Sequence, residues 1–154
     1  MNTTRRLWLK AAGSAGLLTS AVAAGLLKPG RALADWDSAA FSATRLTDAL
    51  AAIGASGATT SLDVVVKTPD IAENGAVVPV EIVTTLPNVE SIAILADKNP
   101  TPLIVQYTLT DFDGMLTTRI KMRETAKVRA IVKAGGKLYT SAKEVKITIG
   151  GCGG

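Results

Sequence analysis

Apolar residues recur with two different periods along the chain. Between Asp35 and Ile53 they follow each other at about helical spacing, and Gly54 is placed to cap the end. The residues that carry this pattern are Trp36, Phe41, Leu46, Leu50 and Ile53. One N-terminal helix is therefore predicted over residues 35–54, followed by a small, polar joint at residues 55–61. From Leu62 onward apolar and polar residues alternate, which is typical of strands.

Short strand patterns separated by turn signals fill residues 62–149. We expect strands over residues 62–67, 77–85, 89–96, 103–110, 115–122, 127–133, 138–140 and 143–149. Residues 69–75 are expected to form a turn or loop, with Asn74-Gly75 as its turn dipeptide, and residues 134–137 a hairpin turn. Pro79 interrupts its strand and, lacking a backbone donor, indicates an edge or a bulge. Seven or eight strands with no helices between them predict an all-β, immunoglobulin-like sandwich.

The strand expected at residues 89–96 has more apolar residues than a strand with one buried face needs. Ile92, Ile94 and Leu95 lie on both of its faces. We therefore expect a partner chain to cover this strand, so the isolated chain should expose an apolar patch.

Residues 1–34 are predicted to be a targeting segment and no part of the fold. An uncharged run at residues 11–27 and an A-x-A cleavage pattern at residues 32–34 follow Arg5 and Arg6. The run is too short and too poor in large apolar residues for a membrane anchor. The stretch from Thr4 to Lys10 is similar to the twin-arginine export motif, with Trp8 where Phe is usual. We expect a twin-arginine signal peptide, export to the periplasm and a mature chain that begins near Asp35.

Charge and composition exclude several kinds of function. The net charge is +4, but residues 1–34 contain five of the 17 basic residues and none of the 13 acidic ones. The rest of the chain is nearly neutral, so the charge does not indicate nucleic-acid binding. The chain contains no histidine and one cysteine. This composition excludes histidine-dependent triads and dyads, most zinc sites, intrachain disulfides and cysteine clusters. We expect no metal and no cofactor.

The one cysteine, Cys152, has two glycines on each side, Gly150-Gly151 and Gly153-Gly154. A cysteine is usually buried in a core, but glycines provide no side chains to build a core around this one. The simple alternative is a flexible chain end that carries an incidental thiol. Glycine permits nearly all backbone conformations, and five residues extend about 17 Å. We expect residues 150–154 to form a flexible arm that carries the thiol into a narrow cleft of another protein.

The Gly150-Gly151-Cys152-Gly153-Gly154 ending, together with the twin-arginine leader, resembles the SoxY family, the Y subunits of the SoxYZ sulfur carrier of bacterial thiosulfate oxidation. Four internal segments are similar to motifs of that family, namely residues 71–80, 98–102, 118–122 and 136–139. The resemblance covers the chain from Thr4 to Gly154.

This resemblance implies a carrier that serves partner enzymes and is not itself an enzyme. A haem c-type enzyme would join thiosulfate to Cys152 as an S-thiosulfonate. A dimanganese hydrolase would then release sulfate and leave a persulfide. A molybdenum sulfur dehydrogenase would oxidise the outer sulfur in organisms that have one. The resemblance also implies a heterodimer with a SoxZ-type, immunoglobulin-like subunit.

Arg119, Lys121 and Arg123 form a basic stripe on one face of a predicted strand. Such a stripe is either a solvated face or a docking surface, for acidic partner enzymes or for the SoxZ-type subunit.

Other interpretations of the tail stay open. A carrier that ends in Gly-Gly would use the carboxylate of Gly154 as a thiocarboxylate, but the leader and the strand count argue against it. A one-cysteine thiol enzyme needs a basic residue or a helix N-terminus beside the thiol, and the tail offers neither. A purely structural sandwich would leave Cys152 unexplained.

Overall fold

The computed structural model describes residues 38–149. The chain divides into two units, residues 1–36 and 37–154, and all the described residues belong to the second unit. The predicted signal peptide at residues 1–34 and the predicted arm at residues 150–154 lie outside the described residues.

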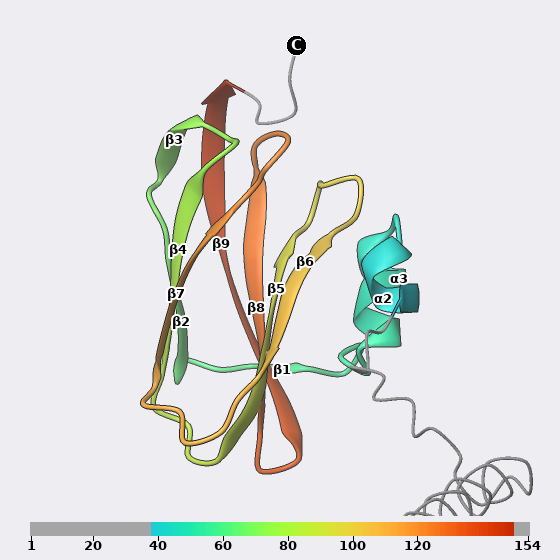
Figure 1. The fold of residues 1–154 in the computed structure, drawn as a ribbon, viewed down its shortest axis with the longest axis vertical. Helices are drawn as coiled ribbons and strands as arrows, with labels where there is room; N and C mark the ends of the chain where they lie inside the picture. Colours follow the sequence, from blue (N-terminus) through green and yellow to red (C-terminus); the bar gives the residue numbers. More distant parts are fainter. Residues whose placement is uncertain (1–37, 150–154) are drawn as a thin grey trace, which may run out of the picture. The chain divides into compact units, whose positions relative to one another are not determined.

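The described residues form two packed β-sheets with two short helices beside them (Figure 1). The larger sheet has the strand order β1-β9-β8-β5-β6, with β3 also paired to β9, and the smaller sheet has the order β2-β4-β7. The strands are β1 Thr59–Thr60, β2 Val64–Lys67, β3 Ile71–Asn74, β4 Val78–Thr84, β5 Val89–Ala96, β6 Leu103–Thr108, β7 Met115–Ile120, β8 Ala126–Ala134 and β9 Lys137–Ile149. The predicted all-β sandwich is confirmed.

The main core lies between the two sheets. Alternate residues of each strand point into it, because successive side chains of a strand face opposite sides. In β4 the inward positions Val78, Val80 and Ile82 are at most 1% exposed, and in β5 Ile92 and Ile94 are fully buried. The smaller sheet contributes its inner face to this core, and its outer face is left to solvent.

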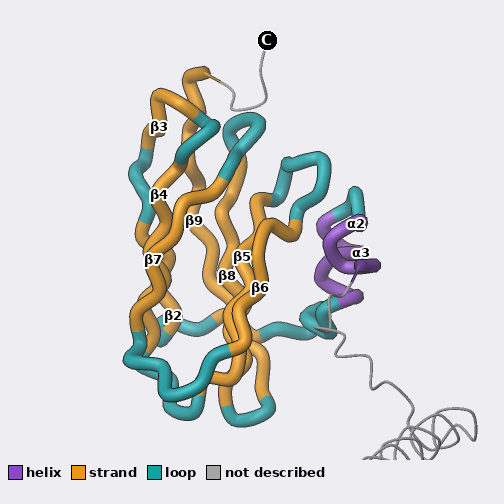
Figure 2. Tube along the Cα trace, in the orientation of Figure 1, coloured by secondary structure: helices purple, strands orange, loops and turns teal. Residues whose placement is uncertain are grey.

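Two short helices, α2 Ser38–Ser42 and α3 Leu46–Ala52, replace the single helix predicted over residues 35–54 (Figure 2). The prediction was wrong because Phe41 and Leu46 are five residues apart, a step that a continuous helix cannot keep on one face. The hydroxyl of Ser42 donates to the carbonyl of Ser38 at 2.6 Å, which helps to end α2. None of the helices in the described part of the chain is long and apolar enough to cross a membrane.

Gly54 caps α3, as predicted. Its φ of 70° is left-handed, and its N–H donates to the carbonyl of Ala51 at 3.0 Å. The N–H of Ala55 reaches back to the carbonyl of Leu50 at 2.7 Å. These two bonds are the pair expected of a Schellman cap, in which a glycine adopts the left-handed conformation at little steric cost.

The helices cover the outer face of β5, which was expected to be covered by a partner chain. Ala93 and Leu95 of β5 form a second apolar cluster with Ala40 of α2 and Ala49 of α3. The helices lie on the side of the larger sheet opposite to the smaller sheet (Figure 1). The expectation of an exposed patch along residues 89–96 is therefore wrong, since the chain buries both faces of this strand by itself.

Two strands were missed and two predicted strands are one. β3 lies in the segment expected to be a loop, and β1 lies in the small, polar joint. Both pair in parallel with β9, which runs without a break through the two segments predicted at residues 138–140 and 143–149. β1 and β3 are held by backbone pairing to a distant strand, so neither has a period of its own to detect.

Pro79 lies in β4, the central strand of the smaller sheet, so the predicted edge position is wrong for the strand as a whole. The pairing of β2 with β4 ends at Lys67 and Glu81, however, while β7 continues along β4 and places Arg119 opposite Pro79. At Pro79 the strand therefore has a paired neighbour on one side, which limits the cost of the missing N–H.

The predicted hairpin turn at residues 134–137 joins β8 to β9. Gly135 and Gly136 have φ of 54° and 73°, a turn that favours glycine at both positions. The carboxylate of Glu90 accepts from the N–H of Gly136 at 2.8 Å and pairs with Lys133 at 2.7 Å. The hydrogen bond from Lys133, followed by that from Gly136, lowers the pKa of Glu90.

Replacing Leu95 tests whether the helices belong to the folded core. Leu95→Ala removes a fully buried side chain from the helix–sheet cluster and should lower the free energy of unfolding by about 2–5 kcal/mol. Leu62→Ala is the matched control, because Leu62 is 96% exposed and its loss should change stability by less than about 0.5 kcal/mol. Urea unfolding measures both, and equal effects would mean that the helices do not pack as described.

Candidate functional site

The predicted sulfur attachment site, Cys152, and the glycines of the predicted arm lie outside the described residues. The structure describes the chain up to Ile149, the last residue before them. We call the surroundings of this point the arm root. The arm root consists of the last four residues of β9, the turn at residues 74–77 and the loops at residues 97–102 and 121–125.

One side of the arm root is a parallel pairing between β3 and the end of β9. Asn74, the last residue of β3, lies in register with Ile149. The hydroxyl of Thr148 adds a bond to the carbonyl of Glu73 at 3.1 Å. This edge of β9 is therefore paired with β3 along the last four residues of the strand.

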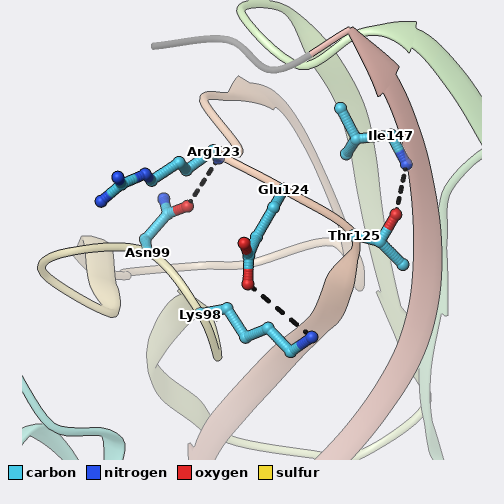
Figure 3. Close-up of polar contacts among 6 residues, drawn as sticks. All are labelled: Lys98, Asn99, Arg123, Glu124, Thr125 and Ile147. Carbon is cyan, nitrogen blue, oxygen red and sulfur yellow. Dashed lines mark hydrogen bonds and ion pairs between the residues drawn. The ribbon is translucent and has the colours of Figure 1, made fainter.

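On the other side, β8 stops before β9 does. Their pairing ends where Ala126 lies opposite Val145. Beyond that point the N–H of Ile147 donates to the hydroxyl oxygen of Thr125 at 2.9 Å (Figure 3). A side chain of the β7–β8 loop thus extends the pairing of β9 past the end of its neighbouring strand, and the strand is held on both sides.

Asn99 fixes the loop that contains Thr125. Its side-chain amide donates to the carbonyl of Lys121 at 2.7 Å. The oxygen of the same side chain accepts from the N–H of Arg123 at 3.0 Å (Figure 3). The intervening residue, Met122, donates its N–H to the carbonyl of Gly75 at 2.7 Å on the opposite side. Asn99 therefore bonds to residues 121–123 as a neighbouring strand would, and three loops become one hydrogen-bonded unit.

The two remaining loops are themselves fixed by local contacts. The side chain of Asn74 accepts from the N–H of Ala76 at 2.8 Å, so Asn74-Gly75 forms the tight turn that the sequence predicts. The carboxylate of Asp97 meets the guanidinium of Arg129 through two bonds, the shorter of 3.0 Å. Both of these side chains are largely buried, at 17% and 23% exposure, which makes this pair a firmer anchor than a surface ion pair.

Segments singled out by the sequence converge at the arm root. Residues 71–80, 98–102 and 118–122 meet there, while residues 136–139 comprise part of the β8–β9 turn and the first residues of β9, at the other end of that strand (Figure 1). The contribution of Thr125 was not predicted, because its partner Ile147 is 22 residues away and no local motif marks it. Asn99 was recognised as part of a similar segment, but its contact with residues 121–123 was not.

Charged side chains surround the arm root without forming a binding site for a metal. Lys98 and Glu124 pair at 3.7 Å with both side chains more than half exposed, so this pair contributes little (Figure 3). Residues 38–149 contain no group of three or more His, Cys, Asp or Glu residues that could hold a metal ion. A cavity of about 500 Å³ lies elsewhere, on the larger sheet, between the end of α3 and the Glu90–Lys133 pair.

Comparison with known proteins indicates a family for the chain. The family model described as "Sulfur oxidation protein SoxY" matches residues 50–152. The solved structure of the sulfur carrier protein SoxY from Chlorobium limicola f thiosulfatophilum is 38% identical, with a TM-score of 0.61, and the match covers 70% of this chain and 95% of that one. A superoxide reductase (neelaredoxin) from Ignicoccus hospitalis is 12% identical, with a TM-score of 0.48 over 55% of this chain and 79% of that one. A search of curated protein sequences found no match.

Removing the hydroxyl of Thr125 tests whether the loop holds the end of β9. Thr125→Val keeps the shape of the side chain but leaves the N–H of Ile147 without its partner, so unfolding should become easier by about 1 kcal/mol. Amide exchange should accelerate at Ile147. Thr117→Val is the control, since Thr117 is exposed on β7 and its hydroxyl has no bond within residues 38–149. Unchanged exchange at Ile147 would contradict the assigned role.

Proposed function

The chain belongs to the SoxY family of sulfur oxidation proteins, and on that premise we propose that it is a periplasmic sulfur carrier whose working group is the thiol of Cys152. The observation that carries the proposal is the extent of the family match, which runs from residue 50 to residue 152 and so ends on the one cysteine of the chain. The related SoxY from Chlorobium limicola f thiosulfatophilum is described as a sulfur carrier protein.

The arm root supports a carrier in which a short arm starts from a fixed point. β9 is bonded to β3 on one side and to Thr125 on the other until its last residues. A fixed starting point lets the direction of the arm be set by the sandwich, while the glycines allow the last residues to adopt whatever path a cleft requires. The thiol would then reach about 10 Å beyond Ile149, since Cys152 is three positions further along the chain.

The chemistry proposed for Cys152 is supplied by visiting enzymes. Joining thiosulfate to the thiol as an S-thiosulfonate removes two electrons and one proton, and a haem c-type enzyme would accept the electrons. Hydrolysis by a dimanganese enzyme would then release sulfate and leave a persulfide on Cys152. A molybdenum sulfur dehydrogenase, where present, would oxidise the outer sulfur so that hydrolysis can occur again. The carrier itself would provide attachment and presentation.

Export and assembly form the rest of the proposal. The twin-arginine pattern at residues 4–10 supports transport to the periplasm. A SoxZ-type, immunoglobulin-like subunit is proposed as the stable partner, and membership of the SoxY family supports this assignment. The surface that this subunit covers is not the outer face of β5, since α2 and α3 already occupy it.

Intact mass spectrometry of protein isolated from thiosulfate-fed cells tests the function directly. We expect adducts of one sulfur or of a sulfonate-bearing group on the C-terminal peptide, and their loss after reduction. Reduction distinguishes the site, because it removes sulfur held on Cys152 through an S–S bond, whereas sulfur held as a thiocarboxylate on Gly154 would survive it. Mass shifts confined to the carboxylate would replace this proposal by the thiocarboxylate alternative.

Replacing the thiol by a hydroxyl should abolish function and spare the fold. Cys152→Ser should accept no thiosulfate from the haem enzyme, because serine cannot form the S–S bond. Its melting temperature should stay within about 2 °C of the parent, as for a surface change. Circular dichroism follows the fold and mass spectrometry the loading. A clear loss of folded structure would mean that Cys152 is a structural residue.

Adding bulk beside the thiol should impair enzymes and leave small reagents unaffected. Gly151→Val together with Gly153→Val places β-branched side chains on both sides of the sulfur and restricts the backbone. We expect loading by the haem enzyme to fall at least about tenfold in kcat/KM, which corresponds to 1.4 kcal/mol. Alkylation by iodoacetamide should stay within a few-fold of the parent. If loading were as fast as in the parent, the glycines would need another explanation.

A further inference from the structure

We propose that the basic stripe of Arg119, Lys121 and Arg123 is a docking surface for the acidic rim of the clefts that receive the arm. The inference rests on the proposed carrier function and assigns a partner-binding surface to it. The three side chains follow β7 and its continuation into the arm root, so they connect the exposed face of the smaller sheet to the point where the chain leaves β9.

Burial shows that the three cations share one outward face. Arg119, Lys121 and Arg123 are all exposed, and the residues between them, Ile120 and Met122, are 3% and 0% exposed. This alternation is that of a strand, in which residues i and i+2 lie about 7 Å apart on the same side. The stripe is therefore a set of three positive charges on one outward face, which begins in β7 and continues into the loop at residues 121–125.

The backbone beneath the stripe is held in this arrangement after β7 itself has ended. Asn99 bonds to Lys121 and Arg123 on one side, and the carbonyl of Gly75 accepts from Met122 on the other. In Figure 3 the side chain of Arg123 extends away from the pair formed by Lys98 and Glu124. A row of charges on a fixed backbone is preorganised for a partner, because little order has to be gained on binding.

None of the three cations has an ion-pair partner within residues 38–149. These residues contain 12 basic and 11 acidic side chains, and five of the basic ones form ion pairs. Lys67 and Arg129, for example, are each bonded to a carboxylate. Three adjacent like charges repel one another, so an acidic surface lying against all three would relieve this repulsion.

Apolar side chains at the margin of the stripe favour a protein over a small anion. Pro79 lies exposed opposite Arg119, and Val77, the last residue of the turn before the same strand, is 55% exposed. Protein interfaces combine buried apolar contacts with a charged rim, whereas a small anion is held by groups that converge on it. An acidic protein surface therefore matches the stripe and its margin in charge and composition.

The test compares charge reversal in the stripe with the same reversal elsewhere. Arg119→Glu with Lys121→Glu is the stripe variant. Arg45→Glu with Lys137→Glu is the control, because these cations are exposed, unpaired within residues 38–149 and located on α3's N-cap and the β8–β9 turn. The full chain, with its SoxZ-type partner, is loaded with thiosulfate by the organism's haem c-type enzyme over a range of salt concentrations. Iodoacetamide alkylation and thermal unfolding are measured in parallel.

We expect kcat/KM of the stripe variant to fall about tenfold or more at low salt, with the difference shrinking at high salt as the charges are screened. The control should stay within about twofold, and alkylation and unfolding should not change. Equal loading of parent and stripe variant, or equal losses in stripe variant and control, would overturn the docking surface. So would loss of heterodimer formation in the stripe variant, which would assign the stripe to the other subunit. A parent that accepts no thiosulfate at all would instead contradict the proposed function.

Discussion

The order of the larger sheet depends on the backbone pairing of β9. This strand of 13 residues bonds to β8 along one edge and to β1 and then β3 along the other. β1 and β3 have two and four residues, far too few to be stable as strands by themselves. They exist because β9 offers them an edge, and their presence in turn leaves no free edge at the point where β9 ends. The geometry of the arm root follows from this one strand.

Small side chains allow α2 and α3 to pack closely against the larger sheet. Ala40, Ala49 and Ala55 are almost fully buried against Ala93 and the neighbouring large residues of the larger sheet. Alanine permits the backbones of a helix and a sheet to approach closely, and it costs no side-chain entropy on burial. This second cluster explains how a chain with few aromatic residues buries both faces of β5 and leaves the smaller sheet as its exposed face.

Alternation was a reliable guide wherever one face of a strand is buried. It located β4, β5 and β8, whose inward residues form the main core, and glycine chemistry located the β8–β9 turn. It could not locate β3, because Ile71 is exposed and Ala72 alone of its four residues is buried. Alternation also could not show that α2 and α3 cover the outer face of β5, since these helices lie more than 40 positions earlier in the chain. Cys152 could be singled out from its neighbours in sequence, whereas Asn99 and Thr125 act on segments 22 residues away and carry no local signature.

The connection between β2 and β3 affects which parts of the fold unfold together. β2 belongs to the smaller sheet and β3 to the larger one, so the short connection at Thr68–Asp70 joins the two sheets directly. The ammonium group of Lys143 in β9 secures this connection by bonding to the carbonyl of Thr68 at 2.8 Å and pairing with Asp70 at 2.9 Å. The end of a chain commonly frays ahead of the rest of a domain. Here the crossover is bonded to β9 at Lys143, three positions before the pairing with β3 begins at Lys146, so fraying of the last residues of β9 leaves these bonds between the connection and the larger sheet in place.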